Sequence, residues 1–327
     1  SRGISCCRIR FSWELSNMRC YQPSGNYQLN SIVLMFVYGL LSAGLTGLVF
    51  GLLAPFSDIS IVFPILIGIL PAIGTSMGSR AGHCRNTAII IAIGFLMGLT
   101  GYAGKQYVAY RLYRDNAIAK IQAEQAGKAA HSGQPAQNAT ELHDAFLTMK
   151  TGRSGFWGWT SLALEKGVSI KVRGHERIRF GYAAALILAL IDFLLAGISS
   201  AVLAEGSSDE PYCEKCRRWV DYERKFETTP DFIAEAEKFL RAQPDDSCPV
   251  GLLQKPPAVQ PDGQLGVLTL KICPSCHDGY LSGESQTLNR EKRKVTTQVF
   301  KNVAFPRNSW KAMFEEPFDK PASPKRA

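Results

Sequence analysis

The sequence predicts a membrane α-helical fold with four transmembrane helices, followed by a small α+β zinc-ribbon-like C-terminal domain. Four nearly uncharged stretches lie between residues 30 and 204, each close to the roughly 20 residues that a helix needs to cross a bilayer. The segment after residue 204 is far more polar, and it holds two Cys-x-x-Cys pairs. This contrast argues against a purely soluble globular protein.

The expected domain organisation follows this change in composition. We expect an N-terminal tail over residues 1–30 and a transmembrane domain over 31–204, with a long loop at 105–179. The zinc-ribbon-like domain is expected over 205–308, before a C-terminal tail at 309–327.

The net charge of +9 belongs to the predicted membrane half of the chain. Residues 204–327 hold nineteen basic and nineteen acidic side chains, so this segment is neutral overall. Surfaces that bind nucleic acid are usually basic as a unit. We therefore expect no nucleic-acid partner, and we attribute the basic excess to cations that flank membrane helices.

The first predicted span covers residues 31–53 and the second covers 59–77, and so short a connection predicts an antiparallel hairpin. Small residues at every fourth position of the first span form one stripe, where another helix can approach closely. They are Gly39, Ala43, Gly47 and Gly51. We interpret this stripe as ordinary helix packing, with a role in conduction as the alternative.

Two prolines in the second span predict a kink. Pro64 and Pro71 lack the backbone N–H that a helix interior needs. The carbonyls four residues earlier, at Ser60 and Ile67, are therefore expected to have no partner within the helix.

The third span is expected over residues 87–104, with a second small-residue stripe at Gly94, Gly98 and Gly101. Its helix is expected to continue, because the tyrosines around its end are typical of a membrane interface. They are Tyr102, Tyr107, Tyr110 and Tyr113. A short amphipathic helix is expected at 140–150, and the aromatic segment from residue 156 is expected to lie in the interface.

The fourth span, residues 180–203, contains one acidic residue, Asp192, near the expected midplane of the bilayer. Small residues share its face, so Asp192 is expected to point toward the other helices rather than toward lipid. No Lys, Arg or His lies in any predicted span. We therefore expect a protonated carboxyl that is hydrogen-bonded to Ser42 or to the carbonyl of Ile67, with a proton- or cation-binding site as the alternative.

Four short motifs resemble those of a family of uncharacterised bacterial multi-pass inner-membrane proteins. They are Tyr-Gln-Pro-Ser-Gly at 21–25, Cys-Arg-Asn at 84–86, Gly-Val-Ser-Ile at 167–170 and Pro-Tyr-Cys at 211–213. The resemblance implies a multi-pass protein of a bacterial inner membrane. The family has no known activity, so the resemblance adds nothing on mechanism.

The strongest chemical signal is the two Cys-x-x-Cys motifs, formed by Cys213 and Cys216 and by Cys273 and Cys276. Two residues between cysteines let one turn present both sulfurs to one ion, and two such turns complete a tetrahedral site. Four thiolates leave no open coordination position. The sequence therefore predicts structural Zn²⁺ rather than a catalytic metal.

Other uses of these cysteines are less well supported. A thioredoxin-like redox pair is disfavoured because no βαβ pattern surrounds either motif. Cys248 and His277 could each replace a ligand, but we expect both to be bystanders.

The 56 residues between the two motifs exceed the spacing of a compact ribbon and predict an insertion. A helix is expected at about residues 230–242, with Thr229 as its N-cap and Pro230 at its first position. A proline-rich loop is expected to follow. Strands are expected at 266–272 and 294–303, on either side of the second motif.

We interpret the chain as a scaffold or regulatory component of a membrane assembly, with the lipid bilayer and other membrane proteins as partners. A proton- or cation-coupled transport subunit that uses Asp192 is the alternative. The sequence contains no nucleophile elbow, phosphate loop or metalloprotease helix motif. We therefore expect no enzymatic activity and assign no catalytic residue.

Two arguments about topology disagree. Lys and Arg near the helix ends are more numerous on the side of the long loop, nine against six, which would place that loop in the cytoplasm. The charge rule weakens for long loops, however, and reduced thiolates persist best in the cytoplasm. We expect a multi-pass protein of the bacterial inner membrane with cytoplasmic termini.

Overall fold

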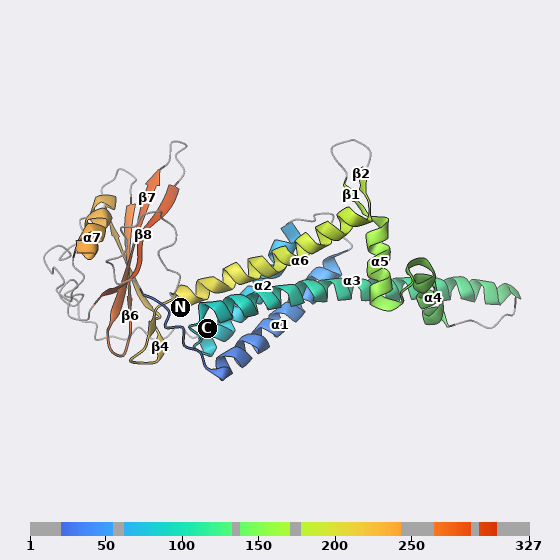
Figure 1. Ribbon diagram of the computed structural model, residues 1–327, viewed down its shortest axis with the longest axis horizontal. Helices are drawn as coiled ribbons and strands as arrows, with labels where there is room; N and C mark the ends of the chain where they lie inside the picture. Colours follow the sequence, from blue (N-terminus) through green and yellow to red (C-terminus); the bar gives the residue numbers. More distant parts are fainter. Residues whose placement is uncertain are drawn as a thin grey trace. The chain divides into compact units, whose positions relative to one another are not determined.

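The computed structural model describes residues 21–54, 62–132, 138–170, 178–242, 265–288 and 294–305. The chain divides into two compact units. One unit is helical and covers residues 27–207, while the other combines the residues up to 26 with those from 208 onward. Figure 1 labels the elements of both units.

Four long helices pack together in the helical unit: α1 (Leu29–Leu53), α2 (Val62–Ala81), α3 (Thr87–Ser132) and α6 (Tyr182–Glu205). All four are long and apolar enough to cross a membrane. They lie where the sequence predicts spans, and α3 continues well past residue 104, as expected. The expected start of the second span falls in residues 55–61, outside the described residues.

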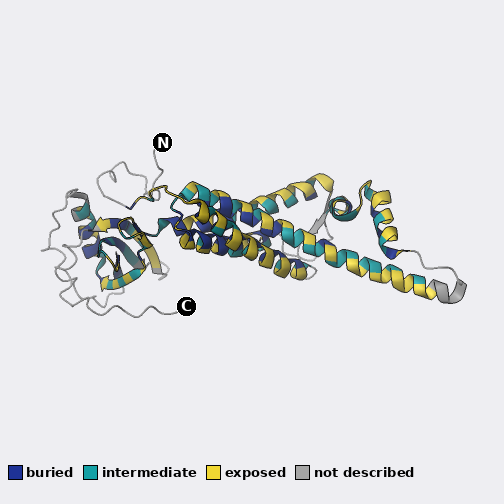
Figure 2. Cartoon of the chain, turned by 90° about the horizontal axis from the view of Figure 1, so that it is seen from below, coloured by how far each residue is buried: buried dark blue, intermediate teal, exposed yellow. Residues whose placement is uncertain are grey.

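Side chains in this bundle are distributed in the opposite way to those of a water-soluble protein. Large aliphatic side chains face outward, with Leu41 exposed by 70% and Ile187 by 58%. The buried residues of α6 are all Gly, Ala or Ser. Figure 2 shows the exposed residues along the outer sides of the helices. An apolar exterior around a small-residue interior suits helices that are surrounded by lipid.

The glycine stripe of α1 packs against α3, which confirms the helix packing predicted for it. A Cβ atom added to Gly39 would lie 2.6 Å from the side chain of Met97. One added to Gly51 would lie 2.5 Å from the side chain of Val108. Gly47 faces the backbone of α3. These contacts require the absence of a side chain on α1.

The second stripe joins α3 to two different helices. Gly94 and Gly98 pack against α6, where their nearest neighbours are Ala204 and Ala196. Gly101 instead faces Pro71 of α2. The small residues of α3 therefore help to bring three helices together.

The two prolines of α2 occupy different positions in the helix. Pro71 lies in the interior, whereas Pro64 is the third residue of the described helix. The carbonyl of Ser60, which Pro64 was expected to leave without a partner, lies outside the described residues. Pro71 is therefore the described source of the predicted kink, because it lacks the N–H that a helix interior needs.

Short elements connect α3 to α6: α4 (Ala139–Thr151), α5 (Gly155–Lys166), β1 (Val168–Ile170) and β2 (Ile178–Phe180). α4 confirms the helix predicted at 140–150, and it ends at Gly152, whose φ of 72° favours glycine. α5 packs on α3 through aromatic rings. The ring centroid of Tyr110 lies 5.7 Å from that of Phe156 and 5.9 Å from that of Trp159.

The second unit is built on a four-stranded antiparallel sheet of order β5-β6-β7-β8. Its strands are β5 (Tyr222–Thr228), β6 (Leu265–Ile272), β7 (Gly279–Leu288) and β8 (Lys294–Phe305). The helix α7 (Pro230–Ala242) packs on this sheet and buries Phe232 and Ile233 against Leu268, Leu270 and Leu281.

The structure confirms the predicted helix and both predicted strands of this unit. The side chain of Thr229 accepts a hydrogen bond from the N–H of Phe232 at 3.3 Å, as expected of an N-cap. β6 and β8 match the strands predicted at 266–272 and 294–303. β5 and β7 were not predicted, and the proline-rich loop lies outside the described residues.

Tyr21 belongs to the sheet unit although it precedes α1 in the chain. Its N–H donates to the carbonyl of Asn302 in β8 at 2.7 Å, and its ring meets that of Tyr280 edge-on at 5.5 Å. The side chain of Asn302 in turn donates to the carbonyl of Asp209 at 2.6 Å. Buried contacts at β8 thus fix both the segment before α1 and the segment after α6.

Candidate metal centre

Two turns present the four cysteines. Cys213 and Cys216 lie on a small hairpin of β3 (Tyr212–Cys213) and β4 (Arg218–Trp219). Cys273 and Cys276 lie in the turn between β6 and β7, where the N–H of Cys273 donates to the carbonyl of Asp278 at 2.9 Å. Each pair is therefore held by a strand-turn-strand unit.

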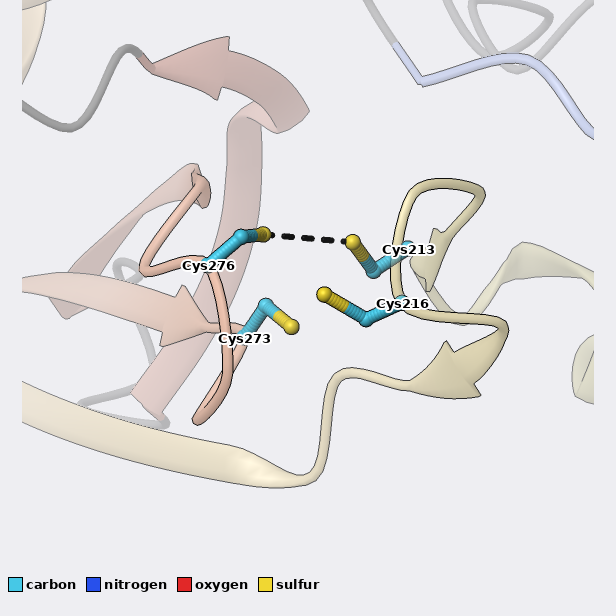
Figure 3. A group of neighbouring side chains, drawn as sticks. All are labelled: Cys213, Cys216, Cys273 and Cys276. Carbon is cyan, nitrogen blue, oxygen red and sulfur yellow. Dashed lines mark hydrogen bonds between the residues drawn. The ribbon is translucent and has the colours of Figure 1, made fainter.

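The four sulfur atoms converge on one point. All four Sγ atoms lie within 4.8 Å of one another, and those of Cys213 and Cys276 are 3.3 Å apart. Figure 3 shows one pair facing the other across the gap between the two turns. Tetrahedral coordination with zinc–sulfur bonds of about 2.3 Å would place the sulfurs about 3.8 Å apart. The cluster is therefore compact enough to surround one tetrahedral ion.

The cysteines are shielded but not cross-linked. Cys213 and Cys273 are buried, Cys216 and Cys276 are half-buried, and Val220 packs beside them. None of the cysteines that the structure describes forms a disulfide. The four thiols thus remain available as ligands.

The two turns share a backbone feature. The residue that follows the second cysteine of each pair, Arg217 or His277, has a positive φ, of 52° and 62° respectively. Neither residue is glycine, so both adopt a conformation that side chains usually avoid. The positive φ occurs at equivalent positions of both turns. It bends the backbone of each turn around its pair of sulfur atoms.

Polar side chains also join one turn to the other. Nζ of Lys215 lies 2.9 Å from a carboxylate oxygen of Asp278, and Nη1 of Arg218 donates to Oγ of Ser275 at 2.9 Å. In each contact one residue comes from the first turn and the other from the second. These contacts link the outer surfaces of the two turns.

Burial and backbone donors shift the pKa values of the thiols in different directions. Burial raises the pKa of Cys276 to about 11, and it also raises the pKa of Cys213 and Cys216. Burial acts in the same direction on Cys273, but the N–H groups of Cys276 and Ser275, together with the thiols of Cys276 and Cys213, outweigh it and lower the pKa of Cys273. Cys273 is therefore the sulfur whose surroundings most favour the anion.

The two residues considered as substitute ligands lie outside this cluster. Cys248 falls outside the described residues. His277 adjoins Cys276 but does not belong to the ligand group found among the described residues.

Asp192, the other predicted site residue, is half-buried in α6. In the described part of the chain it makes no hydrogen bond to Ser42, whose hydroxyl donates to the carbonyl of Gly39 at 2.9 Å. Lys105 on α3 is the cation whose charge acts on Asp192, but no ion pair joins the two in the part of the chain that the structure describes. The expectation that Asp192 is a protonated, structural carboxyl stays a prediction.

Aromatic and amide groups surround this pair. The ammonium of Lys105 lies 5.4 Å from the ring centroid of Tyr102, and the hydroxyl of Tyr102 accepts a hydrogen bond from Gln106 at 3.0 Å. The ring of Tyr102 meets that of Phe193, the neighbour of Asp192, at 5.9 Å. Sequence reasoning did not connect Lys105 or Gln106 with Asp192, although their four-residue steps along α3 from Gly101 and Tyr102 were visible.

Comparisons with known protein families, with curated proteins and with solved structures found no match. The fold and the site define the protein at the level of a class. It combines four apolar helices with an antiparallel sheet that carries a four-cysteine cluster able to bind a metal ion.

Proposed function

We propose that the chain is an integral membrane protein whose C-terminal domain binds one structural zinc ion and serves as a scaffold or regulatory component of a membrane assembly. The convergence of four sulfur atoms within 4.8 Å of one another carries the proposal. The proposal assigns no catalytic step.

The donor set supports zinc. Four sulfur ligands in tetrahedral arrangement favour zinc or iron among the common metals. The cluster is compact enough for a single ion, and two polar contacts between the turns already hold the ligands in place. Metal analysis of the purified protein separates the two metals, because iron with four thiolates absorbs visible light and zinc does not.

A structural role follows from the ligands. Four thiolates occupy every position of a tetrahedral ion, so no site remains for substrate or water. The ion would join the β3–β4 hairpin, which follows α6, to the turn between β6 and β7. Such a link stabilises a small domain whose core is formed by one helix and one sheet.

The reversed distribution of apolar side chains supports insertion in a membrane, and the sequence favours a bacterial inner membrane with cytoplasmic termini. Resistance of the protein to alkaline carbonate extraction tests insertion. A reporter fused after Ala327 that is active only in the cytoplasm tests the topology.

The scaffold role is tested by partner capture. Cys213→Ser should reduce recovery of partner proteins with the tagged chain from cross-linked membranes, while solute flux stays unchanged. Cys248→Ser is the matched control, because it removes a cysteine outside the proposed ligand set. Equal recovery of partners by both variants would contradict the proposal.

The second candidate is a proton- or cation-coupled transport subunit. Two ionisable groups of the helical unit favour it: Asp192 on α6, and Lys105 on α3, whose ammonium lies over the ring of Tyr102. Ionisable groups inside a bundle often mark transport pathways. Asp192→Asn would then abolish pH-dependent flux into vesicles while the protein still inserts. Under the scaffold proposal the same variant leaves flux unchanged.

A further inference from the structure

The turn between α4 and α5 exposes two large apolar side chains and two cations. Met149 is exposed by 75% and Trp157 by 65%. Lys150 and Arg153 are exposed beside them. We call these four residues the α4–α5 corner. No Asp or Glu occurs between Asp144 and Glu165, so the charge of the corner is wholly positive.

The level of α5 along α3 follows from helix geometry. Tyr107 and Tyr110 come 20 and 23 residues after Thr87, the first residue of α3. At 1.5 Å per residue these positions lie about 30 and 35 Å from the start of the helix, which matches the roughly 30 Å thickness of the hydrocarbon layer. The ring of Phe156 packs on both tyrosines, at 6.2 and 5.7 Å between centroids. α5 is therefore held where α3 would leave the hydrocarbon.

The direction of α5 suits a helix at a membrane surface. Figure 1 shows α5 crossing α3 close to the beginning of α6, rather than running alongside these helices. α5 contacts both helices. A helix that crosses a transmembrane bundle at the interface lies in the plane of the bilayer.

The corner also contains an open recess of about 640 Å³, lined by Gly152, Arg153, Ser154 and Trp157. Its lining thus includes one residue with an indole ring and one with a guanidinium group. Indole rings prefer the headgroup level of a bilayer, and guanidinium groups bind phosphate. The chemistry of the recess therefore matches a phospholipid headgroup.

We propose that the α4–α5 corner docks on the bilayer surface and binds anionic phospholipid. Trp157 and Met149 enter the boundary between headgroups and acyl chains, while Lys150 and Arg153 contact lipid phosphates. The inference rests on the proposed insertion of the four helices. The docking proposal adds a preference for anionic over neutral lipid. Cations close to an anionic surface are stabilised by its negative potential, which a neutral surface lacks.

Tryptophan quenching by brominated lipid tests the position of the corner. The full-length protein is reconstituted in phosphatidylcholine vesicles with or without phosphatidylglycerol, and the acyl chains are brominated near the headgroup. Trp157→Phe should lose the larger part of the quenching. Trp219→Phe is the matched control, because it removes the same side chain from the sheet unit, where the ring packs against Tyr212. The quenching lost by Trp157→Phe should exceed the quenching lost by this control.

Charge variants test the lipid preference. Lys150→Gln combined with Arg153→Gln should abolish the additional quenching that phosphatidylglycerol produces. Lys120→Gln combined with Lys238→Gln removes the same charge from exposed positions elsewhere and should retain it. Equal quenching in both vesicle types by the parent protein would overturn the preference for anionic lipid.

Carbonate extraction of the same vesicles separates the two proposals. If the protein remains integral but Trp157→Phe changes no quenching, the corner faces water or a protein partner, and the docking proposal is overturned. If carbonate releases the protein, membrane insertion itself fails, and the docking proposal fails with it.

Discussion

Gly47 of α1 and Gly104 of α3 meet backbone to backbone. A Cβ atom added to Gly47 would lie 2.9 Å from the carbonyl carbon of Gly104 and 3.0 Å from its Cα. Backbone atoms cannot rotate away as a flexible side chain can. The distance between the two helices at this level is therefore set by the absence of side chains.

Gly47→Leu should destabilise the bundle by about 1 to 3 kcal/mol, because the new side chain forces α1 and α3 apart. Gly44→Leu is the matched control, since nothing lies within 4 Å of a Cβ added there. Thermal unfolding of both variants in detergent measures the difference. Equal unfolding temperatures would contradict the packing role of Gly47.

The purified full-length protein should contain about one zinc ion per chain, because the four sulfurs can surround a single ion. Cys276→Ser should lose most of this metal, and Cys248→Ser should retain it. Elemental analysis of protein prepared under reducing conditions makes the measurement. Zinc that is absent from the parent protein, or equally present in all three proteins, would exclude the proposed ligand set.

Lys105 and Asp192 should be energetically coupled. Lys105→Met and Asp192→Leu each leave one charge without its partner, whereas the double variant leaves none. A double-mutant cycle on unfolding in detergent should give a coupling of about 0.6 to 1.7 kcal/mol, by analogy with polar pairs between membrane helices. Strictly additive effects would show that the two charges do not interact.

Ile233 should contribute more to the stability of the sheet unit than any exposed residue of α7. It is fully buried, and its side chain lies over Gly266 and Gly283, where a Cβ would meet it at 2.9 and 3.0 Å. Ile233→Ala should lower the free energy of unfolding by about 2 to 5 kcal/mol. Glu235→Ala, at an exposed position of the same helix, should cost much less. Denaturant unfolding followed by the fluorescence of Trp219 distinguishes the two.

Elements with strong local signals could be predicted from the sequence. The four apolar helices follow from length and composition, and α7 follows from the cap at Thr229 and the proline after it. The grouping of the four cysteines could be predicted as well, because each pair needs only one turn and two pairs complete one coordination shell.

Strand β5 was missed because a charged residue occupies its inner face. Tyr222, Arg224 and Phe226 alternate with more exposed neighbours, as expected for a strand, but Arg224 masks the apolar pattern. The structure resolves this conflict by placing the guanidinium of Arg224 5.4 Å from the ring centroid of Phe226. Such a contact depends on the finished strand and cannot be read from residue types.

The proximity of Lys105 to Asp192 was missed for a different reason. The continuation of the third helix past Gly104 was expected, but Lys105 was placed at the membrane interface and not beside the fourth helix. Which residue of α3 lies near Asp192 depends on how α3 and α6 pack, and no local pattern contains that information.

The hydrogen bond between Tyr21 and Asn302 joins a residue that is synthesised early to one that is synthesised late, so it can form only after the four helices have been made. Tyr21 leaves the ribosome before any of the four apolar helices, and Asn302 leaves it after all of them. Under our proposal the four helices cross the membrane an even number of times, so the segment after α6 lies on the same side of the membrane as Tyr21. If one helix failed to insert, Tyr21 and β8 would lie on opposite sides of the bilayer and could not form their hydrogen bond. Completion of the sheet unit would thus report that an even number of helices has been inserted, and the loss of any single helix would prevent it.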